Sequence, residues 1–267
     1  MPILHLVILA AVQGLTEFLP ISSSGHLALV PTFLGWPDQG LIMDVAVHVG
    51  TLFAVLVYLY RDVGAMLVGI GRFLKGRPDP GSKLFMLLVV GTIPVVIAGY
   101  ALHHFDVNMF RSIEVIAWAT LGFGILLWVA DQVGMTVRRI EHLGFFDVII
   151  IGLAQCLSLI PGTSRSGITM TAARFIGMER LDAARFSMLL SIPVIIAAGT
   201  LSGIDIYQSG DVALAADAFV AAGLAFIFAL IAIALMMAWL RRASFLPFVI
   251  YRIGLGAFLL AVAYGIL

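Results

Sequence analysis

Long apolar runs divide the chain, and two further apolar regions are broken in the middle by polar residues. A helix that crosses a bilayer needs about 20 mostly apolar residues. Five uninterrupted runs approach or reach this length, at about 85–102, 113–130, 186–201, 218–240 and 248–267. A sixth run, 41–60, is interrupted by Asp44 and His48. The pattern therefore predicts six membrane-spanning helices.

The two broken regions, about 3–35 and 145–177, carry proline, glycine, serine and threonine between their apolar ends. Each region is too long for one span and too interrupted for two. Non-helical backbone at membrane depth is tolerated only where it is buried in protein or lines a wet cavity. We therefore expect each region to be a re-entrant helical hairpin.

The lysines and arginines support this division, because the cytoplasmic loops of membrane proteins are enriched in both. The connection 61–83 contains five of them and is predicted to be cytoplasmic, whereas 103–112 contains only Arg111 and 202–217 contains none. The later basic stretches lie on the cytoplasmic side only if 145–177 turns back without crossing. With two re-entrant hairpins, the alternation holds at every connection.

The two broken regions also resemble each other at an offset of 142 residues. The recurring pairs are Gln13 and Gln155, Leu15 and Leu157, Ser22 and Ser164, Ser24 and Ser166, and Gly25 and Gly167. We interpret the chain as a single membrane domain, 1–267, with pseudo-repeat halves at about 1–131 and 145–267. Each half has one hairpin and three spans, and an odd number of spans inserts the second half upside down. The predicted fold is an all-α integral membrane protein with six transmembrane helices and two re-entrant hairpins in an inverted-topology repeat.

The composition agrees with this fold class. Hydrophobic residues make up 62% of the chain and charged residues 11%, against roughly 45–50% and about 25% in soluble domains. The net charge of zero suggests no nucleic-acid partner, and the single Cys156 cannot form an intramolecular disulfide. No lysine or arginine precedes Arg61, so the first apolar run lacks the basic region of a signal peptide and is expected to belong to the mature protein.

The polar centres of the broken regions predict an anion site. Gln13 and Glu17 are four residues apart and share a helix face. The following Pro20 ends that helix, and Ser23 or Ser24 is predicted to cap the next one.

The second region repeats this plan, with Ser164 or Ser166 as the cap and Arg165 at the break. Two helix N-termini would then converge with free N–H groups, and Arg165 adds a guanidinium fork suited to phosphate.

Other roles for these residues stay open. Glu17 and Arg165 could form a purely structural ion pair, although each charge at mid-membrane costs about 2.5–3.5 kcal/mol, which favours a functional role. His26 lies within one helical turn of Ser22 and Ser23, so it is a candidate for proton transfer or phosphate contact, with a hydrogen-bonded core histidine as the alternative.

Three more polar residues lie within predicted spans. Asp44 and His48 share a helix face, and either line the cavity or pack in the core. Arg252 either extends to the membrane interface or faces the cavity.

The stretches "QGLTEFLPISSSGH", 13–26, and "PGTSRSG", 161–167, resemble the two signature regions of the undecaprenyl-diphosphate phosphatase family, the bacitracin-resistance proteins BacA. The likeness extends over nearly the whole chain and includes "SFLPFVIYR" near its end. It implies a multi-pass enzyme of the bacterial inner membrane with an active site that opens to the periplasm. Such an enzyme removes the terminal phosphate of undecaprenyl diphosphate, the lipid carrier of peptidoglycan synthesis, and depends on a divalent metal, Mg²⁺ or Ca²⁺.

The resemblance also implies residue roles. Ser23 matches the proposed nucleophile, His26 the motif histidine, and Arg165 the phosphate-binding arginine. Glu17 matches the second acidic position and Gln13 the first, which is Glu in many members, so Glu17 is expected to be the main metal ligand and Gln13 a second one. The remaining candidates for phosphate contact are Ser22, Ser24, Gly25, Thr163, Ser164, Ser166 and Gly167.

The sequence leaves several alternatives. The nucleophile could be Ser23, another serine, His26 or water. The sequence also leaves open whether the protein forms a homodimer, and it predicts membrane lipid as a surrounding partner. A type-2 phosphatidic-acid phosphatase is disfavoured, because Thr171 stands six residues after Arg165, where that class has histidine. The main rival is a flippase of a prenyl phosphate, which would need Arg165 but no nucleophile.

Overall fold

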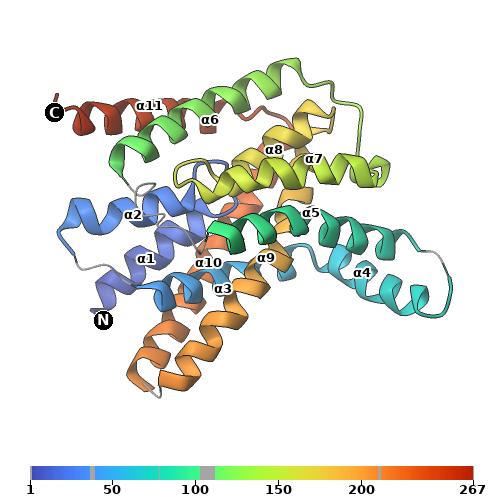
Figure 1. The fold of residues 1–267 in the computed structure, drawn as a ribbon, viewed down its shortest axis with the longest axis horizontal. Helices are drawn as coiled ribbons and strands as arrows, with labels where there is room; N and C mark the ends of the chain where they lie inside the picture. Colours follow the sequence, from blue (N-terminus) through green and yellow to red (C-terminus); the bar gives the residue numbers. More distant parts are fainter. Residues whose placement is uncertain (1, 37–39, 78, 103–111, 210–211, 267) are drawn as a thin grey trace.

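The computed structural model describes residues 2–36, 40–77, 79–102, 112–209 and 212–266, and the regular elements in these ranges are helices. They appear along the chain in Figure 1 as α1 Ile3–Thr16, α2 Ser23–Leu34, α3 Leu41–Tyr58, α4 Tyr60–Phe73, α5 Pro80–Leu102, α6 Ile113–Val133, η2 Ile140–His142, α7 Phe145–Gln155, η3 Cys156–Leu159, α8 Arg165–Phe175, α9 Arg180–Ser209, α10 Val212–Leu240 and α11 Leu246–Ala263. The expected all-helical class is confirmed.

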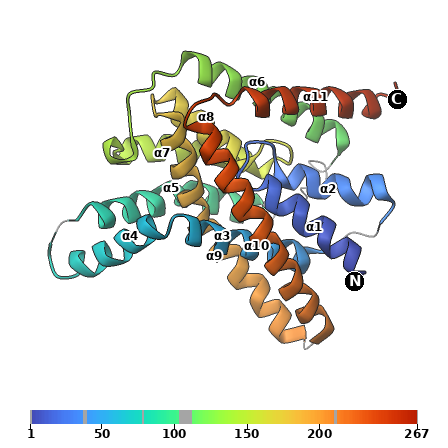
Figure 2. The same cartoon turned by 180° about the vertical axis from the view of Figure 1, so that it is seen from behind.

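The two broken regions each form a pair of short helices joined by a tight turn. The pair α1 and α2 enters from one end of the molecule and the pair α7 and α8 from the other, so that their turns meet at the centre (Figures 1 and 2). Helix α1 packs on α10, and α7 packs on α5. Because α5 and α10 hold equivalent places in the two halves, each hairpin packs on a long helix of the other half.

The connection expected at 61–83 is instead largely helical. Helix α4 turns by 82° from α3 and then lies against the start of α5. A β-carbon on Gly81 would lie 2.1 Å from the carbonyl oxygen of Ala65, and one on Gly69 would lie 2.4 Å from the amide of Ser82. Small residues thus let these two helices touch. The sequence pattern did not predict α4, because charged residues interrupt its small and apolar positions.

The connection expected at 202–217 is also mostly helical, since α9 continues to Ser209 and α10 begins at Val212. The connection expected at 103–112 lies almost wholly outside the described residues.

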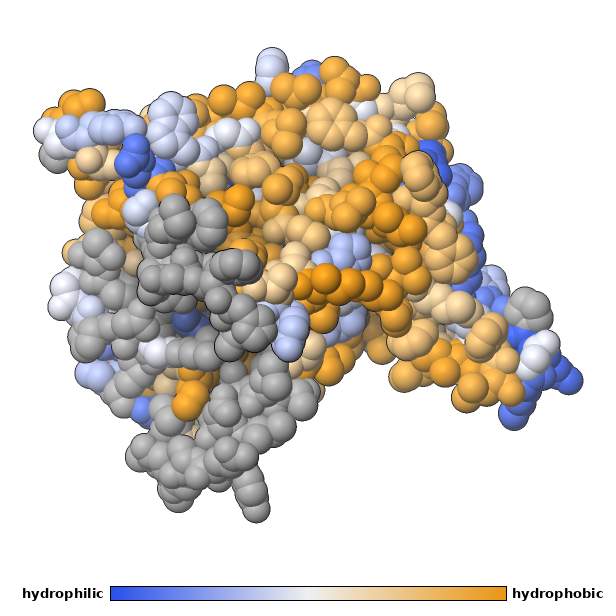
Figure 3. All heavy atoms as spheres, in the orientation of Figure 1, coloured by the Kyte–Doolittle hydropathy of each residue, from blue (hydrophilic) through white to orange (hydrophobic). Residues whose placement is uncertain are grey.

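Four helices within the described ranges are long and apolar enough to cross a membrane, and a fifth span results if the bent pair α3 and α4 counts as one. The four are α5, α6, the 215–240 part of α10, and α11. Many of their large apolar side chains are exposed, as Ile97 and Leu235 illustrate. Hydrophobic residues cover most of the face in Figure 3, and hydrophilic residues gather at the tip of the α4–α5 pair. The chain is therefore a multi-pass membrane protein.

Helices α3 and α10 cross closely at Gly50 of α3. A β-carbon there would lie 2.1 Å from the carbonyl oxygen of Ala222 on α10. We expect Gly50→Ala to push the two helices apart and to destabilise the protein by about 1–3 kcal/mol, measured as unfolding in detergent. Gly223→Ala, on α10 with no heavy atom within 4 Å of its β-carbon, is the matched control and should not destabilise. Equal stability of the two variants would contradict the close crossing.

Candidate active site

The turn of the first hairpin places Glu17 directly after α1 and Ser23 at the start of α2. Ser22, with a positive φ of 73°, caps α2 through its Oγ, which accepts a hydrogen bond from the Gly25 amide at 3.3 Å. The expectation that Ser23 or Ser24 caps this helix is therefore wrong. The cap falls one residue earlier, because Ser22 rather than Ser23 lies three residues before an amide that its side chain can reach. Ser23 Oγ is thereby left for another partner.

The second turn has the same local geometry. Ser164 has a φ of 72°, and its Oγ accepts a hydrogen bond from the Gly167 amide at 3.0 Å. Of the two expected caps, Ser164 is confirmed, while Ser166 Oγ lies 3.1 Å from Ser164 Oγ. A positive φ at a residue other than glycine costs about 1–3 kcal/mol, and such strain clusters at functional sites. The repeat seen in the sequence is therefore also a repeat of an unusual backbone conformation.

The two turns contact each other through side chains. Arg165 Nη2 donates a hydrogen bond to Glu17 Oε1 at 2.7 Å, and Ser166 Oγ donates to the carbonyl oxygen of Leu19 at 2.8 Å. Arg165 Nη1 is held by the carbonyl oxygen of Ser187 on α9 at 3.1 Å. The expected convergence of Glu17 and Arg165 is therefore present, and the ion pair of the alternative interpretation is formed.

Glu17 is the centre of this cluster. Its Oε2 accepts hydrogen bonds from Ser23 Oγ at 2.6 Å and from Gln13 Nε2 at 2.9 Å. His48 Nε2, from α3, lies 3.6 Å from the same oxygen. The buried carboxylate is thus surrounded by hydrogen-bond donors, and one of them is the hydroxyl of Ser23.

Ser23 has the geometry of an activated nucleophile. A nucleophile and its general base are recognised by a hydrogen bond of about 2.6–3.2 Å, and Ser23 donates such a bond to Glu17. Its side chain is only partly buried, whereas Ser22 and Ser164 are buried and act as caps. Among the candidate serines, Ser23 is therefore the one placed beside a base.

His26 is oriented away from Ser23. Its Nδ1 lies 2.7 Å from the carbonyl oxygen of Ser22, so this nitrogen donates. Its Nε2 lies 2.6 Å from Tyr251 Oη, and the two rings stack. Since neither ring nitrogen faces Ser23, the geometry favours Glu17 rather than His26 as the acceptor of the Ser23 proton.

The remaining candidates surround the two turns. Gly25, Thr163, Ser166 and Gly167 are buried, and Ser24 is exposed. A β-carbon on Gly25 would lie 3.5 Å from the Cα of Gly162, so the backbones of the two turns are close. Phosphate contacts at these residues stay predictions.

Two residues near this cluster were not assigned from the sequence. The only signal for His48 in the sequence is its spacing from Asp44, which leaves open whether it lines the cavity or packs in the core. Tyr251 is 225 positions from His26, and no local pattern predicts their contact.

Glu17 and Gln13 are the protein groups expected to hold a metal. No group of three or more His, Cys, Asp or Glu side chains suited to a metal occurs among the described residues. However, the buried Gln13 Oε1 has no hydrogen-bond partner, and it belongs to the side chain that binds Glu17. Mg²⁺ commonly takes one or two carboxylates and completes its shell with substrate phosphates and water. Glu17 and Gln13 fit a metal of that kind.

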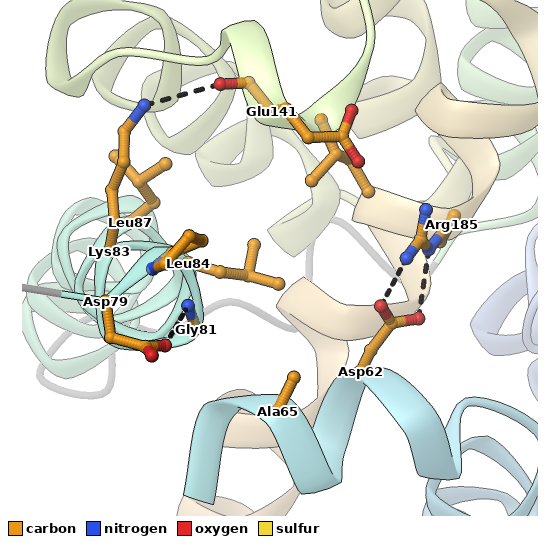
Figure 4. Close-up of a pocket in the computed structure, with 11 residues that line it drawn as sticks. Asp62, Ala65, Asp79, Gly81, Lys83, Leu84, Leu87, Glu141 and Arg185 are labelled. Carbon is orange, nitrogen blue, oxygen red and sulfur yellow. Dashed lines mark hydrogen bonds and ion pairs between the residues drawn. The ribbon is translucent and has the colours of Figure 1, made fainter. Parts of the chain in front are cut away.

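A hollow of about 630 Å³ lies between α4, α5, η2 and α9 (Figure 4). Its charged lining is largely paired, since Arg185 binds Asp62 and Arg72 binds Asp79. The hydrogen bond from Arg72 holds the pKa of Asp79 below its usual value. No serine or histidine is among the residues that line it, so this hollow lacks the chemistry of the two turns.

Comparison with known proteins agrees with the geometry. The profile of the family described as bacitracin resistance protein BacA matches residues 6–258, which include both hairpins. The chain belongs to the BacA family.

Curated relatives match the chain over nearly its full length. Undecaprenyl-diphosphatase 1 of Rhodospirillum rubrum is 54% identical, over 99% of this chain and 96% of that protein. The undecaprenyl-diphosphatase of Ruegeria pomeroyi is 53% identical, over 99% of this chain and all of that protein. That of Maricaulis maris is 48% identical, over 97% and 98%. The BacA family resemblance of the two signature stretches is thereby confirmed.

Proposed function

We propose that this BacA family member is an undecaprenyl-diphosphatase, which hydrolyses undecaprenyl diphosphate to undecaprenyl phosphate and inorganic phosphate. Relatives that match this chain over nearly its full length carry that name. The observation that carries the proposal is the hydrogen bond of 2.6 Å from Ser23 Oγ to Glu17, whose other oxygen accepts from Arg165. A hydroxyl, a base and a guanidinium are thus joined where two hairpins meet.

Binding of the diphosphate is assigned to Arg165 and to those first N–H groups of α2 and α8 that the caps Ser22 and Ser164 leave free. Such groups have no partner within the helix, and they attract anions together with the positive end of the helix dipole. The guanidinium fork matches phosphate oxygens in geometry and charge. The charge that grows on the phosphoryl oxygens in the transition state is thereby stabilised.

In the chemical step, Ser23 Oγ attacks the terminal phosphorus and its proton passes to Glu17. The bond between that phosphorus and the bridging oxygen breaks, Glu17 passes its proton to the leaving phosphate oxygen, and undecaprenyl phosphate leaves. Water then gives a proton to Glu17 and attacks the phosphoserine, and Glu17 returns this proton to Ser23 Oγ as inorganic phosphate is released. Direct attack by water on the diphosphate is the alternative and would use the same base.

The proposed cofactor is Mg²⁺ or Ca²⁺, which Glu17 and Gln13 would hold. It would neutralise part of the diphosphate charge. Glu17 would still receive the proton of Ser23.

We place the protein in the bacterial inner membrane, with six spans, two re-entrant hairpins and an active site open to the periplasm. The opposed entry of the hairpins and the basic residues between 61 and 83 support this placement. The apolar prenyl chain would then stay in lipid while its diphosphate reaches the turns. A flippase would need Arg165 but gains nothing from the contact of Ser23 with Glu17, which favours the enzyme.

The test is phosphate release from undecaprenyl diphosphate by purified protein in detergent, with and without EDTA. We expect release that EDTA abolishes and added Mg²⁺ or Ca²⁺ restores. Absence of release from folded, monodisperse protein that still binds a prenyl methylenediphosphonate would overturn the phosphatase and favour a carrier. Release that EDTA leaves unchanged would contradict the proposed metal requirement and would still support the phosphatase activity.

A further inference from the structure

Arg252 of α11 is a buried cation that contacts both turns. Its side chain is fully buried, so it does not extend to the membrane interface. The guanidinium donates hydrogen bonds to five main-chain carbonyl oxygens, those of Pro20 at 3.2 Å, Ala119 at 3.4 Å, Thr120 at 3.1 Å, Gly162 at 3.0 Å and Thr163 at 2.9 Å.

These carbonyl groups belong to three separate parts of the chain. Pro20 lies in the first turn, midway between Glu17 and Ser23. Gly162 and Thr163 lie in the second turn, just before Arg165. The other two carbonyls belong to α6. One side chain therefore joins both turns to each other and to a helix that belongs to neither hairpin.

No ion pair between Arg252 and a carboxylate is formed in the described part of the chain. Among the described residues, carbonyl dipoles balance its charge. A charged side chain inside a membrane protein is expensive, and such residues usually serve function. An apolar residue of similar volume would avoid this cost, but it would leave the five carbonyl groups without this donor.

The space around the guanidinium depends on two glycines. A β-carbon on Gly124 of α6 would lie 2.9 Å from Arg252 Cβ, and one on Gly167 of α8 would lie 2.8 Å from Arg252 Nη1. Small residues on two helices thus leave a slot that the arginine fills.

The preceding residue of α11 supports the same role. Tyr251 Oη lies 2.6 Å from His26 Nε2, and His26 in turn binds the carbonyl oxygen of Ser22. Two consecutive residues of α11 therefore both hold the first turn.

We propose that Arg252 is a positioning residue for the reaction, which fixes the two turns relative to each other and so sets Ser23 and Glu17 against Arg165. This inference rests on the proposed phosphatase function. Arg252 acts through the backbone of both turns and need not touch the substrate. A misplacement of about 1 Å at an active site can lower the rate about 100-fold, so small shifts of one turn should be visible in kcat.

Two variants test this role, one at Arg252 itself and one at a glycine that contacts it. Arg252→Lys keeps the charge but offers three donors in place of five. Gly124→Ala keeps Arg252 and crowds its slot. The control is Gly122→Ala, two residues away on the same helix, exposed, and with no heavy atom within 4 Å of the added β-carbon. We expect Arg252→Lys and Gly124→Ala to lower kcat by about 10- to 100-fold, with a smaller change in KM. Gly122→Ala should match wild type.

The measurement is phosphate release per folded protein, well below the unfolding temperature of each variant. The affinity for a prenyl methylenediphosphonate is measured in parallel, and we expect it to fall several-fold in Arg252→Lys and Gly124→Ala. Folded Arg252→Lys and Gly124→Ala that both keep wild-type kcat and affinity would overturn the proposal. Wild-type protein that binds the analogue without releasing phosphate would overturn the phosphatase, and the affinities would then decide whether Arg252 positions the turns.

Discussion

Replacing Ser23 by alanine is expected to lower kcat for phosphate release by at least about 1000-fold, because the variant has no hydroxyl to attack the terminal phosphorus. Its affinity for a prenyl methylenediphosphonate should stay within a few-fold of wild type, since Arg165 and both helix N-termini remain. Steady-state phosphate release and analogue binding on the same preparation measure the two quantities. Ser244→Ala, just before α11 and outside both turns, is the matched control and should be fully active.

The covalent step has its own signature. If Ser23 is the nucleophile, rapid acid quenching followed by mass spectrometry should detect phosphoserine at that position in wild-type protein. An active Ser23→Ala variant would assign the attack to water with Glu17 as the base. An inactive variant without detectable phosphoserine in wild type would limit Ser23 to orienting that water.

Replacing Arg165 by alanine is expected to reduce kcat/KM by about 100- to 1000-fold, since the transition state loses a charged donor in a buried site. Binding of the analogue should weaken as well, because the guanidinium acts on substrate and transition state alike. Arg165→Lys should recover only part of this loss, because an ammonium lacks the planar fork that Arg165 directs at Glu17 and Ser187. Phosphate release over a range of substrate concentrations separates kcat from KM.

A matched arginine distinguishes this effect from loss of a charge in general. Arg139 pairs with Glu179 at 3.1 Å, and both side chains are substantially exposed. An exposed ion pair is worth about 0–1 kcal/mol, so Arg139→Ala should leave both stability and activity nearly unchanged. Equal losses in Arg165→Ala and Arg139→Ala would contradict the assignment of Arg165 to phosphate.

The sequence contained the information for the local structure of the site. Apolar runs of bilayer length predict helices because each residue there must satisfy its backbone within its own helix. Breaks rich in serine, proline and glycine predict turns for the same local reason. The pairing of Gln13 with Glu17 follows from helical spacing, and the recurrence of serines at the second break predicted a second turn of the same kind. Glu17 and Arg165 were identified in this way, the role of Ser23 as nucleophile followed from the family resemblance, and the structure places the three residues together.

Other features depended on how distant helices cross. Ser22 rather than Ser23 became the cap because the turn adopts a positive φ, which leaves Ser23 for Glu17. The contact of His26 with Tyr251, the approach of His48 to Glu17 and the five hydrogen bonds of Arg252 each join separate helices. No period or spacing in the sequence encodes such contacts. They follow from packing distances set by small residues such as Gly50 and Gly124, and only the tertiary structure decides where those residues meet.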